Sequence, residues 1–379
     1  MSTPRQIAYI RHGPWCPDGT WAAMPFWLAL PEGTRARLGE LLGEAADFDY
    51  DAAKAVDPEW CADLRTAAAE GLPLFLPAKP GDYPPQDLLK GYHVFLLDYC
   101  YAAAALEALV TEVGPTGRIT ILDHHATNEH TVAAAAAAHP DLIEAVFDMD
   151  RSGAEIAWDY AREHKVYTGQ ESRIMRYVGD RDTWRWALPQ SKEVNAALRI
   201  ANVSSSLGRA TRAYAAEVAA GEQAIADYAL AGTHYLEAQM EIVNAVARSA
   251  KVAYVTARDP DSGTLREYRI RAVNCPTLQS EIGHAAGTLE IEDGVLPDFA
   301  AVWYYTHAAD ETRISLRRGH PAVDLSKVAP TIVGVLSGGG HAGAAGCAVK
   351  GSDVKSIFRT HPSERRPSPE PVEAKSAGV

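Results

Sequence analysis

Three ionisable side chains end one of the apolar runs of the chain, and this placement constrains the fold more than any other feature. The run "ITIL", residues 119–122, is followed directly by Asp123, His124 and His125. Three further apolar runs, "IAYIRH", "YHVFLLD" and "LIEAVFD", alternate with alanine-rich segments of helical pattern. Alternating strand and helix patterns are typical of a parallel sheet covered by helices. We therefore predict an α/β fold with polar residues at the strand ends.

The length and the change of pattern along the chain predict two domains. At 379 residues the chain exceeds one domain of ordinary size. We predict a parallel-sheet catalytic domain over 1–190, with an insertion at about 31–80, and a helical linker over 191–250. The runs "KVAYVTA", "EYRIRAV", "DFAAVWYYT" and "TRISLRR" then predict a smaller α/β domain over 251–360. Residues 361–379 contain almost no large apolar side chain, which is typical of a disordered tail.

The composition excludes several classes of protein. A formal net charge of −13 argues against binding to long duplex nucleic acid, because such binding needs many Lys and Arg contacts to phosphates. The chain has no run of about 18 apolar residues, and its first residues lack the apolar segment of a secretory signal. We therefore expect a cytoplasmic protein without a membrane partner. The five cysteines form no C-x-x-C pair, and this pattern argues against both a disulfide framework and a zinc ribbon.

Polar residues recur where the predicted strands end, and this is where ligands bind in a parallel sheet. Taken singly, each such residue is commonly a helix cap or a turn former. Their recurrence in four segments instead favours a metal site built from His12, Asp18, Asp98, the triplet Asp123 to His125, Asp180 and Asp182. Carboxylate and imidazole groups without thiolate favour a divalent ion such as Mn²⁺, with Mg²⁺, Co²⁺ and Zn²⁺ left open.

The glycine-rich segment "SGGGHAGAAG" has three interpretations. Gly338, Gly340 and Gly343 match the G-x-G-x-x-G motif of dinucleotide-binding folds, but the motif lies at the end of the last domain. The acidic residue expected about 20 positions further on would fall in the proline-rich tail. In a phosphate cradle, the backbone N–H groups of Gly338, Gly339 and Gly340 would approach an anion, and His341 would add a donor. The third interpretation is a tight turn between a strand and a helix.

Together these motifs resemble the DHH phosphoesterase superfamily, named for the triplet that is present here as Asp123, His124 and His125. The resemblance is greatest to the branch of nano-RNases and cyclic-nucleotide phosphodiesterases. It covers "RHGPWCPDGTWAA", "VFLLDYCY", "ILDHHAT", "SGAEIAWDY" and "YVGDRDTW" in the first domain. In the second domain "VNCPTLQSEIGH", "ISLRRG" and "GGGHAGAAG" resemble the DHH-associated substrate domain.

The resemblance implies a two-metal centre with Mn²⁺ as the expected ion. His12 and Asp18 would hold the first metal, and Asp98 would bridge both. His124 and Asp180 would hold the second. These five residues are the metal ligands that we predict.

The resemblance also implies roles around the metals. Asp123 would orient a ligand, and His125 would face the scissile phosphate as a catalytic residue. In the second domain the substrate's phosphate would be bound by Arg317, the backbone of Gly338, Gly339 and Gly340, and His341.

One departure concerns the first motif. The commonest family pattern is H-x-x-x-D-x-D, whereas here five residues separate His12 from Asp18, and Thr20 stands where the second aspartate would be. The nano-RNase-like branch also tends to lack that aspartate. The second metal is then expected to bind more weakly, or Asp182 completes its ligands. Asp182 could equally cap a helix.

We predict a metal-dependent phosphodiesterase that hydrolyses short oligoribonucleotides or small cyclic or linear dinucleotides by attack of hydroxide formed at the metals. The alternatives are a phosphatase acting on 3′-phosphoadenosine 5′-phosphate and a degenerate nucleotide-binding sensor, for which Thr20 is the main argument. A dinucleotide-dependent dehydrogenase rests on the glycine motif alone. The expected partner is a short RNA or small nucleotide substrate, and a homodimer is left open.

Overall fold

The computed structural model describes residues 6–13, 16–42, 58–259, 262–292 and 294–362. The chain forms two compact units, Met1–Leu236 and Glu237–Val379, and each is described below by itself. Most of the predicted tail, from residue 363 onward, lies outside the described residues. Within the described ranges, no helix combines the length and the apolar character needed to cross a membrane.

The first unit is built on a five-stranded sheet in the order β2-β1-β3-β4-β5, and every neighbouring pair is parallel. The strands are β1 (Ile7–His12), β2 (Leu74–Ala78), β3 (His93–Leu97), β4 (Arg118–Asp123) and β5 (Ile143–Phe147). The predicted α/β class and the four predicted strands of this unit are confirmed. Strand β2 was not predicted, because its run "LFLPA" contains Pro77, which a strand tolerates only at an edge position such as this one.

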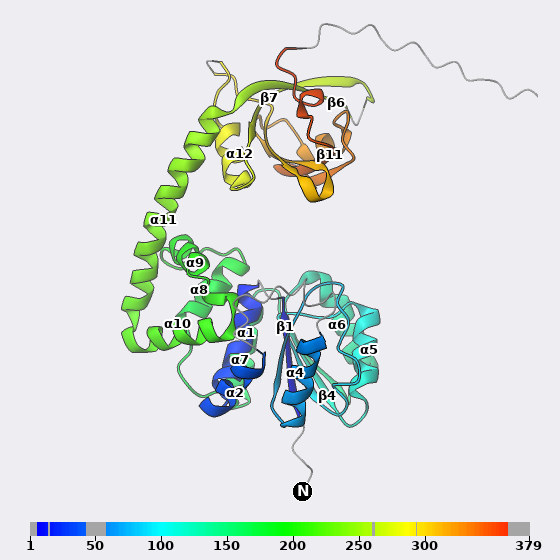
Figure 1. Ribbon diagram of the computed structural model, residues 1–379, viewed down its shortest axis with the longest axis vertical. Coiled ribbons are helices and arrows are strands. Elements are labelled where there is room, and N and C mark those ends of the chain that lie inside the picture. The colour runs from blue at the N-terminus through cyan, green and yellow to red at the C-terminus, as the bar shows by residue number, and fades with distance from the viewer. Residues whose placement is uncertain (1–5, 14–15, 43–57, 260–261, 293, 363–379) are drawn as a thin grey trace, which may run out of the picture. The chain divides into compact units, whose positions relative to one another are not determined.

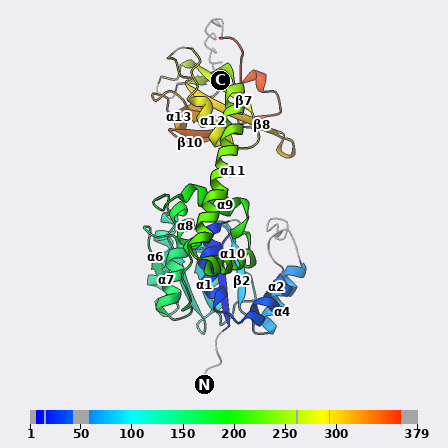
Figure 2. The same ribbon diagram turned by 90° about the vertical axis from the view of Figure 1, so that its left-hand side faces the viewer.

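Helices cover both faces of this sheet. Figure 1 shows α1 and α7 on one side and α5 and α6 on the other, while α2 and α4 pack together beside the edge strand β2 (Figure 2). Both faces of the central strands are therefore buried, and Leu96, Leu97, Ile121 and Leu122 are inaccessible to solvent. The helices are α1 (Pro17–Leu28), α2 (Glu32–Leu42), α4 (Pro58–Ala69), α5 (Ala103–Val113), α6 (Glu129–Ala138), α7 (Gly153–Glu163) and α8 (Arg173–Asp182).

The segment predicted as a linker, 191–250, is helical. It contains α9 (Ser191–Ile200), α10 (Leu207–Ala220) and α11 (Glu222–Ser249). A Cβ atom at Gly232 would lie 1.8 Å from the carbonyl oxygen of Glu193, so this glycine lets α11 pack directly against α9. Helices α9, α10 and the first part of α11 thus belong to the first unit, and the predicted boundary moves from residue 190 to residue 236.

The second unit contains a six-stranded sheet in the order β10-β11-β9-β8-β7-β6, in which only the β7–β8 pair is parallel. One face of this sheet carries a core that includes Ile314, Leu316 and Cys347. The predicted second α/β domain is confirmed. Its elements are β6 (Lys251–Arg258), β7 (Leu265–Asn274), α12 (Gln279–Gly287), β8 (Phe299–Thr306), β9 (Glu311–Arg318), α13 (Leu325–Val328), β10 (Ser337–His341) and β11 (Ala344–Lys350).

The glycine-rich segment forms a β-hairpin. Strand β10 pairs antiparallel with β11, from Ser337 opposite Ala348 to His341 opposite Ala344. Both the dinucleotide motif and the turn interpretation require a helix directly after the strand. A second strand follows instead, which contradicts both interpretations and the dehydrogenase hypothesis with them.

Candidate active site

The first unit brings two groups of potential metal ligands together at the carboxyl ends of its strands. His12 ends β1, Asp98 follows β3, and His124 and His125 follow β4. Within each group the ligand atoms all lie within 4.8 Å of one another. The groups are His12, Asp98 and His125, and Asp18, His124 and Asp182.

The start of α1 places Asp18 in this cluster. Cys16 caps the helix, its Sγ accepting from the N–H of Gly19 at 3.5 Å, and Pro17 occupies the first helical position, where its fixed φ is favourable. A Cβ atom at Gly19 would lie 2.5 Å from the carbonyl oxygen of His12. Only glycine therefore lets the first turn of α1 lie against the end of β1.

Asp98 occupies the centre of the cluster in a strained conformation. Its φ is 55°, in the left-handed region, which is uncommon for residues other than glycine and is often found at functional sites. Its Oδ2 lies 3.4 Å from His12 Nδ1, and its Oδ1 lies 3.1 Å from His124 Nε2. The two carboxylate oxygens thus face different histidines, His12 and His124, as the oxygens of a carboxylate that bridges two metals would.

Several of these atoms are buried and form no hydrogen bond among the described residues, because the contacts of 3.1–3.4 Å between them are not aligned for one. They are His12 Nδ1, Asp18 Oδ1, Asp98 Oδ1 and His124 Nε2. Buried polar atoms are normally satisfied, and leaving one unpaired costs about 1–3 kcal/mol. Four such atoms converging at one point fit a bound cation, and imidazole with carboxylate is a donor set that suits divalent ions.

The carboxylates of the cluster also repel one another. Burial raises the pKa of Asp18 well above its ordinary value, and the nearby Asp98 and Asp182 raise it further. Burial and Asp98 likewise raise the pKa of Asp182. For Asp98 burial acts in the same direction, but the contacts with His12 and His124 outweigh it and lower the pKa. A divalent cation would relieve this repulsion.

Asp123 holds His125 and is not itself a candidate ligand. Its Oδ1 accepts hydrogen bonds from the backbone N–H groups of His124 and His125 and lies 2.7 Å from His125 Nδ1. Its Oδ2 accepts from Asn128 Nδ2 at 2.7 Å. The hydrogen bond to Asp123 raises the pKa of His125 to about 9. Asn128 was missed from the sequence, although it follows the triplet closely and amides commonly orient carboxylates.

Asp180 lies away from the cluster. Its Oδ1 accepts from the N–H of Ala187 at 2.9 Å and its Oδ2 from the N–H of Leu188 at 3.2 Å. Burial raises its pKa, but the hydrogen bonds from Ser191, Ala187 and Leu188 outweigh burial and lower it. Asp182 instead lies 3.3 Å from His124 Nε2 through its Oδ2. We therefore replace Asp180 by Asp182 in the set of proposed ligands.

Thr20 does not face the cluster. Its hydroxyl lies 2.9 Å from the carbonyl oxygen of Ser204 and accepts a hydrogen bond from Arg11 Nη1 at 3.1 Å. Arg11 is itself buried, and burial lowers its pKa to about 10. Because Asp182 lies with Asp18 and His124, that group has three potential ligands without an aspartate at position 20.

In the second unit, strand pairing gathers part of the predicted substrate-binding set on one face. Arg317 lies opposite Ala344, which lies opposite His341, and Gly346 lies opposite Gly339. Side chains alternate between the faces of a strand, so Arg317, His341 and Gly339 share the face opposite the core. A pocket of about 540 Å³ on this unit is also lined by Gly339 and Gly346.

Gly338 and Gly340 serve packing and backbone geometry. They point to the other face, where Leu316 and Cys347 contribute to the core. A Cβ atom at Gly338 would lie 2.5 Å from the carbonyl oxygen of Ala329, and Gly340 has a φ of 144° that other residues rarely adopt. Gly338 and Gly339 both line the pocket of this unit, so a cradle formed by the backbone of Gly338, Gly339 and Gly340 stays a prediction.

Arg317 is already held within its own unit. Its Nη1 donates to Ser315 Oγ at 3.1 Å and to the carbonyl oxygen of Leu316 at 2.8 Å, and its Nη2 donates to Ser280 Oγ. Burial lowers its pKa. A Cβ atom at Gly283 would lie 2.8 Å from Arg317 Cγ, so α12 packs directly on the stem of this side chain.

Comparisons with known proteins were made on sequence and on structure. No protein-family model matches the chain. Among curated proteins, the chain is 24% identical over 266 residues to the uncharacterized protein R106 of Acanthamoeba polyphaga mimivirus. The match covers 70% of this chain and 55% of that protein, so the chain spans about half the length of the curated relative that it matches.

Several solved structures are similar to the chain at low sequence identity. The pGpG-specific phosphodiesterase PggH from Vibrio cholerae is 9% identical, with 91% of this chain and 94% of that chain covered and a TM-score of 0.37. An exopolyphosphatase-related protein from Bacteroides fragilis is 12% identical, with coverage of 90% and 86% and a TM-score of 0.36. Exonuclease RecJ bound to manganese is 13% identical, with coverage of 91% and 86% and a TM-score of 0.34. At these TM-scores the function has to be argued from the site itself.

Proposed function

We propose that the chain is a DHH-type metal-dependent phosphodiesterase that hydrolyses short oligoribonucleotides or small nucleotides. The observation that carries the proposal is the convergence of five proposed ligands that include four buried atoms without a hydrogen bond in the described chain. The five are His12, Asp18, Asp98, His124 and Asp182. A pair of divalent cations in these groups would activate water and stabilise the charge on the transferring phosphoryl group. Mn²⁺ is the ion that we propose.

The protein's own residues would orient the reaction. Asp98 would contact both metals, because one of its oxygens faces His12 and the other faces His124. Asp123, fixed by Asn128, would keep His125 Nδ1 occupied and leave Nε2 free to bind the scissile phosphate or to protonate the leaving oxygen. A positioned acid of this kind contributes roughly 10²–10⁴-fold.

The test is hydrolysis, with Mn²⁺, of a labelled RNA trinucleotide, a cyclic dinucleotide and 3′-phosphoadenosine 5′-phosphate, with bound metal measured in parallel. The His124→Ala variant should lose metal and turnover together. The exposed His130, five positions after His125, provides a matched control as His130→Ala. Cleavage of 3′-phosphoadenosine 5′-phosphate alone would favour the phosphatase. The absence of both bound metal and turnover would favour the sensor and overturn the proposal.

A further inference from the structure

A cysteine thiol contacts the proposed metal centre, and beyond its capping of α1 it has no assigned role. Cys16 Sγ lies 3.4 Å from Asp98 Oδ2, the carboxylate oxygen that also faces His12 Nδ1 at 3.4 Å. Thiol and imidazole therefore converge on the same oxygen of the proposed bridging ligand. Mn²⁺ was expected for a set of ligands without thiolate. The contact of Cys16 with Asp98 thus bears on which ion the centre binds.

The separations between these atoms fit a cation bound among them. In a tetrahedral site with a metal–sulfur bond of about 2.3 Å and metal–oxygen and metal–nitrogen bonds of about 2.0–2.1 Å, neighbouring ligand atoms are about 3.3–3.6 Å apart. The distances from Asp98 Oδ2 to Cys16 Sγ and to His12 Nδ1 both fall in this range. The structure therefore allows thiol, imidazole and carboxylate to contact one ion.

Buried atoms without a hydrogen bond provide a second observation that a ligand belongs at this place. Asp18 and Asp98 are each 1% exposed, and the Oδ1 atom of each forms no hydrogen bond in the described chain. Asp98 is also the residue that the Cys16 thiol contacts. A cation among these residues would satisfy the carboxylate oxygens and give the sulfur an ion to bind.

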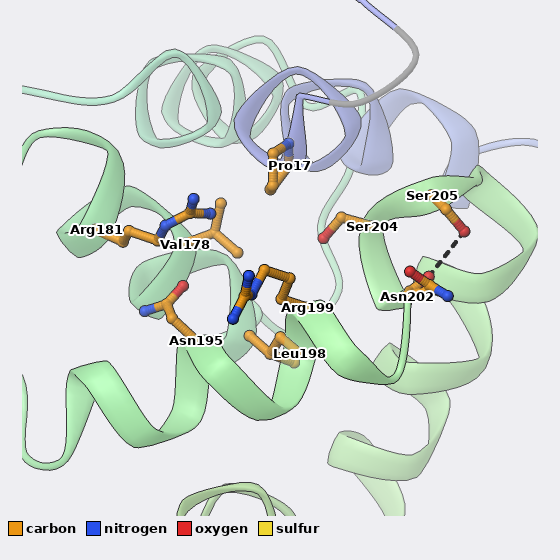
Figure 3. Close-up of a pocket in the computed structure, with 9 residues that line it drawn as sticks. All are labelled: Pro17, Val178, Arg181, Asn195, Leu198, Arg199, Asn202, Ser204 and Ser205. Atoms are coloured by element: carbon orange, nitrogen blue, oxygen red, sulfur yellow. Dashed lines mark hydrogen bonds between the residues drawn. The ribbon is translucent and has the colours of Figure 1, made fainter. Parts of the chain in front are cut away.

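The start of α1 fixes the thiol in this position. Cys16 Sγ accepts from the N–H of Gly19 at 3.5 Å, so the sulfur is held by the cap of the helix. Pro17, the next residue, lines a cavity of about 200 Å³ together with Ser204 (Figure 3). Trp21 Nε1 donates to Ser204 Oγ at 3.1 Å. The first turn of α1 is thus packed inside the unit, and turning the thiol away would break the cap.

A thiol changes the kind of ion that such a centre suits. Carboxylate oxygen suits Mn²⁺ and Mg²⁺, whereas thiolate sulfur favours softer ions such as Zn²⁺. Burial raises the pKa of Cys16, and the carboxylates of Asp98 and Asp18 raise it further, so the thiol keeps its proton in the absence of a cation. Binding of the cation breaks the S–H bond, forms the metal–sulfur bond and releases the proton to the solvent.

We propose that Cys16 is a sulfur ligand of the metal centre and makes the centre bind Zn²⁺ and Co²⁺ more tightly, relative to Mn²⁺, than nitrogen and oxygen ligands alone would. The inference rests on the proposed function, because it concerns the same metal centre. It deepens that function by adding a ligand through which softer ions compete with Mn²⁺.

The spectroscopic test adds Co²⁺ to the metal-free, reduced, full-length protein. Cobalt bound to thiolate absorbs in the near ultraviolet by charge transfer from sulfur, and cobalt bound to nitrogen and oxygen alone lacks this band. The wild type should show the band, and Cys16→Ser should lose it while still binding Co²⁺. Serine is a favourable N-cap, so α1 should persist in the variant. Cys275→Ser provides the control, because Cys275 is also partly buried but lies in the second unit, and this variant should keep the band.

A competition titration gives a second measurement that does not depend on turnover. Zn²⁺ is added to protein loaded with Mn²⁺, and the Mn²⁺ that remains bound is measured. Loss of a group that only orients a ligand weakens metal binding by about 10–100-fold, so Cys16→Ser should need about 100-fold more Zn²⁺ than the wild type. Cys275→Ser should behave as the wild type does.

The outcomes separate the sulfur ligand from the proposed function. Co²⁺ bound to the wild type without the sulfur band, or a Cys16→Ser variant with unchanged band or competition, would overturn the inference and keep the metal centre. The band together with cleavage of 3′-phosphoadenosine 5′-phosphate alone would keep the sulfur ligand and replace the proposed phosphodiesterase by the phosphatase. A wild type that binds neither Co²⁺ nor Mn²⁺ and shows no turnover would overturn both proposals.

Discussion

The carboxyl edge of the first sheet and the glycine-rich face of the second unit were both predicted as functional, but they differ in how their polar groups are satisfied. At the first edge, His12, Asp98 and His124 contain buried atoms without partners in the described chain. On the second face, Arg317 already bonds to Ser280 and Ser315 within its own unit. Unsatisfied buried atoms require something else to bind them, whereas satisfied groups are stable without a ligand. The structure therefore supports a bound ligand at the metal centre more directly than it supports one at Arg317.

Removing the bridging carboxylate should have the largest effect. Asp98→Asn should reduce kcat/KM by about 10³-fold or more, because the ligand shared by both metals contributes several kcal/mol of charge stabilisation. The fold should persist, since asparagine tolerates the left-handed φ of 55° at this position. Turnover and bound metal are measured against Asp141→Asn, an exposed aspartate of the same unit. Full activity of Asp98→Asn would remove Asp98 from the centre.

The two aspartates of α8 should respond in opposite ways. Asp182→Asn should weaken metal binding by about 10–100-fold or more and leave thermal stability unchanged, since its oxygen faces His124. Asp180→Asn should leave metal binding unchanged and cost about 1–3 kcal/mol of unfolding free energy, because asparagine keeps one acceptor oxygen and one of the two backbone N–H groups loses its partner. Metal titration and thermal unfolding of both variants show which of the two aspartates is a metal ligand. The opposite pattern would restore Asp180 as the ligand.

The same pair shows what the sequence could and could not establish. Positions at strand ends, such as Asp98 and His124, were predictable because a buried apolar strand fixes where the following residue emerges. Asp180 and Asp182 sit two positions apart on one helix, where about 100° separates neighbours, so they point to nearly opposite sides. Only one of them can face the metals. The aspartate that faces the metals is decided by the rotation of α8 about its axis in the packed unit, and this rotation cannot be read from a sequence motif.

Strand alternation limited the glycine prediction in a similar way. The motif does not show that a two-residue period places the Cα substituents of Gly338 and Gly340 on the face opposite to that of Gly339, where a Cβ atom would meet the packed core. The sequence did not show that this segment pairs as a hairpin, because its composition equally fits a turn.

Two alanine substitutions on β10 compare packing with binding. Gly338→Ala should lower the unfolding free energy by about 1–3 kcal/mol, because the new methyl group would meet the carbonyl oxygen of Ala329. Gly339→Ala has no atom within 4 Å of its Cβ and should leave stability nearly unchanged. Chemical denaturation measures both. If Gly339 contributes to substrate binding, its variant should raise KM while stability holds. Equal losses of stability in the two variants would contradict the alternation.

Arg317 should show the smallest of these effects. Arg317→Gln should raise KM by about tenfold, or about 1.4 kcal/mol, with kcat and bound metal nearly unchanged. Glutamine retains part of the stem against which Gly283 packs, so the substitution tests the charge more than the packing. The next residue offers a control as Arg318→Gln, which faces the other way on β9. Because Arg317 is bonded within its own unit, an unchanged KM would assign it to the structure of the second unit and leave the metal centre as the site that recognises the substrate.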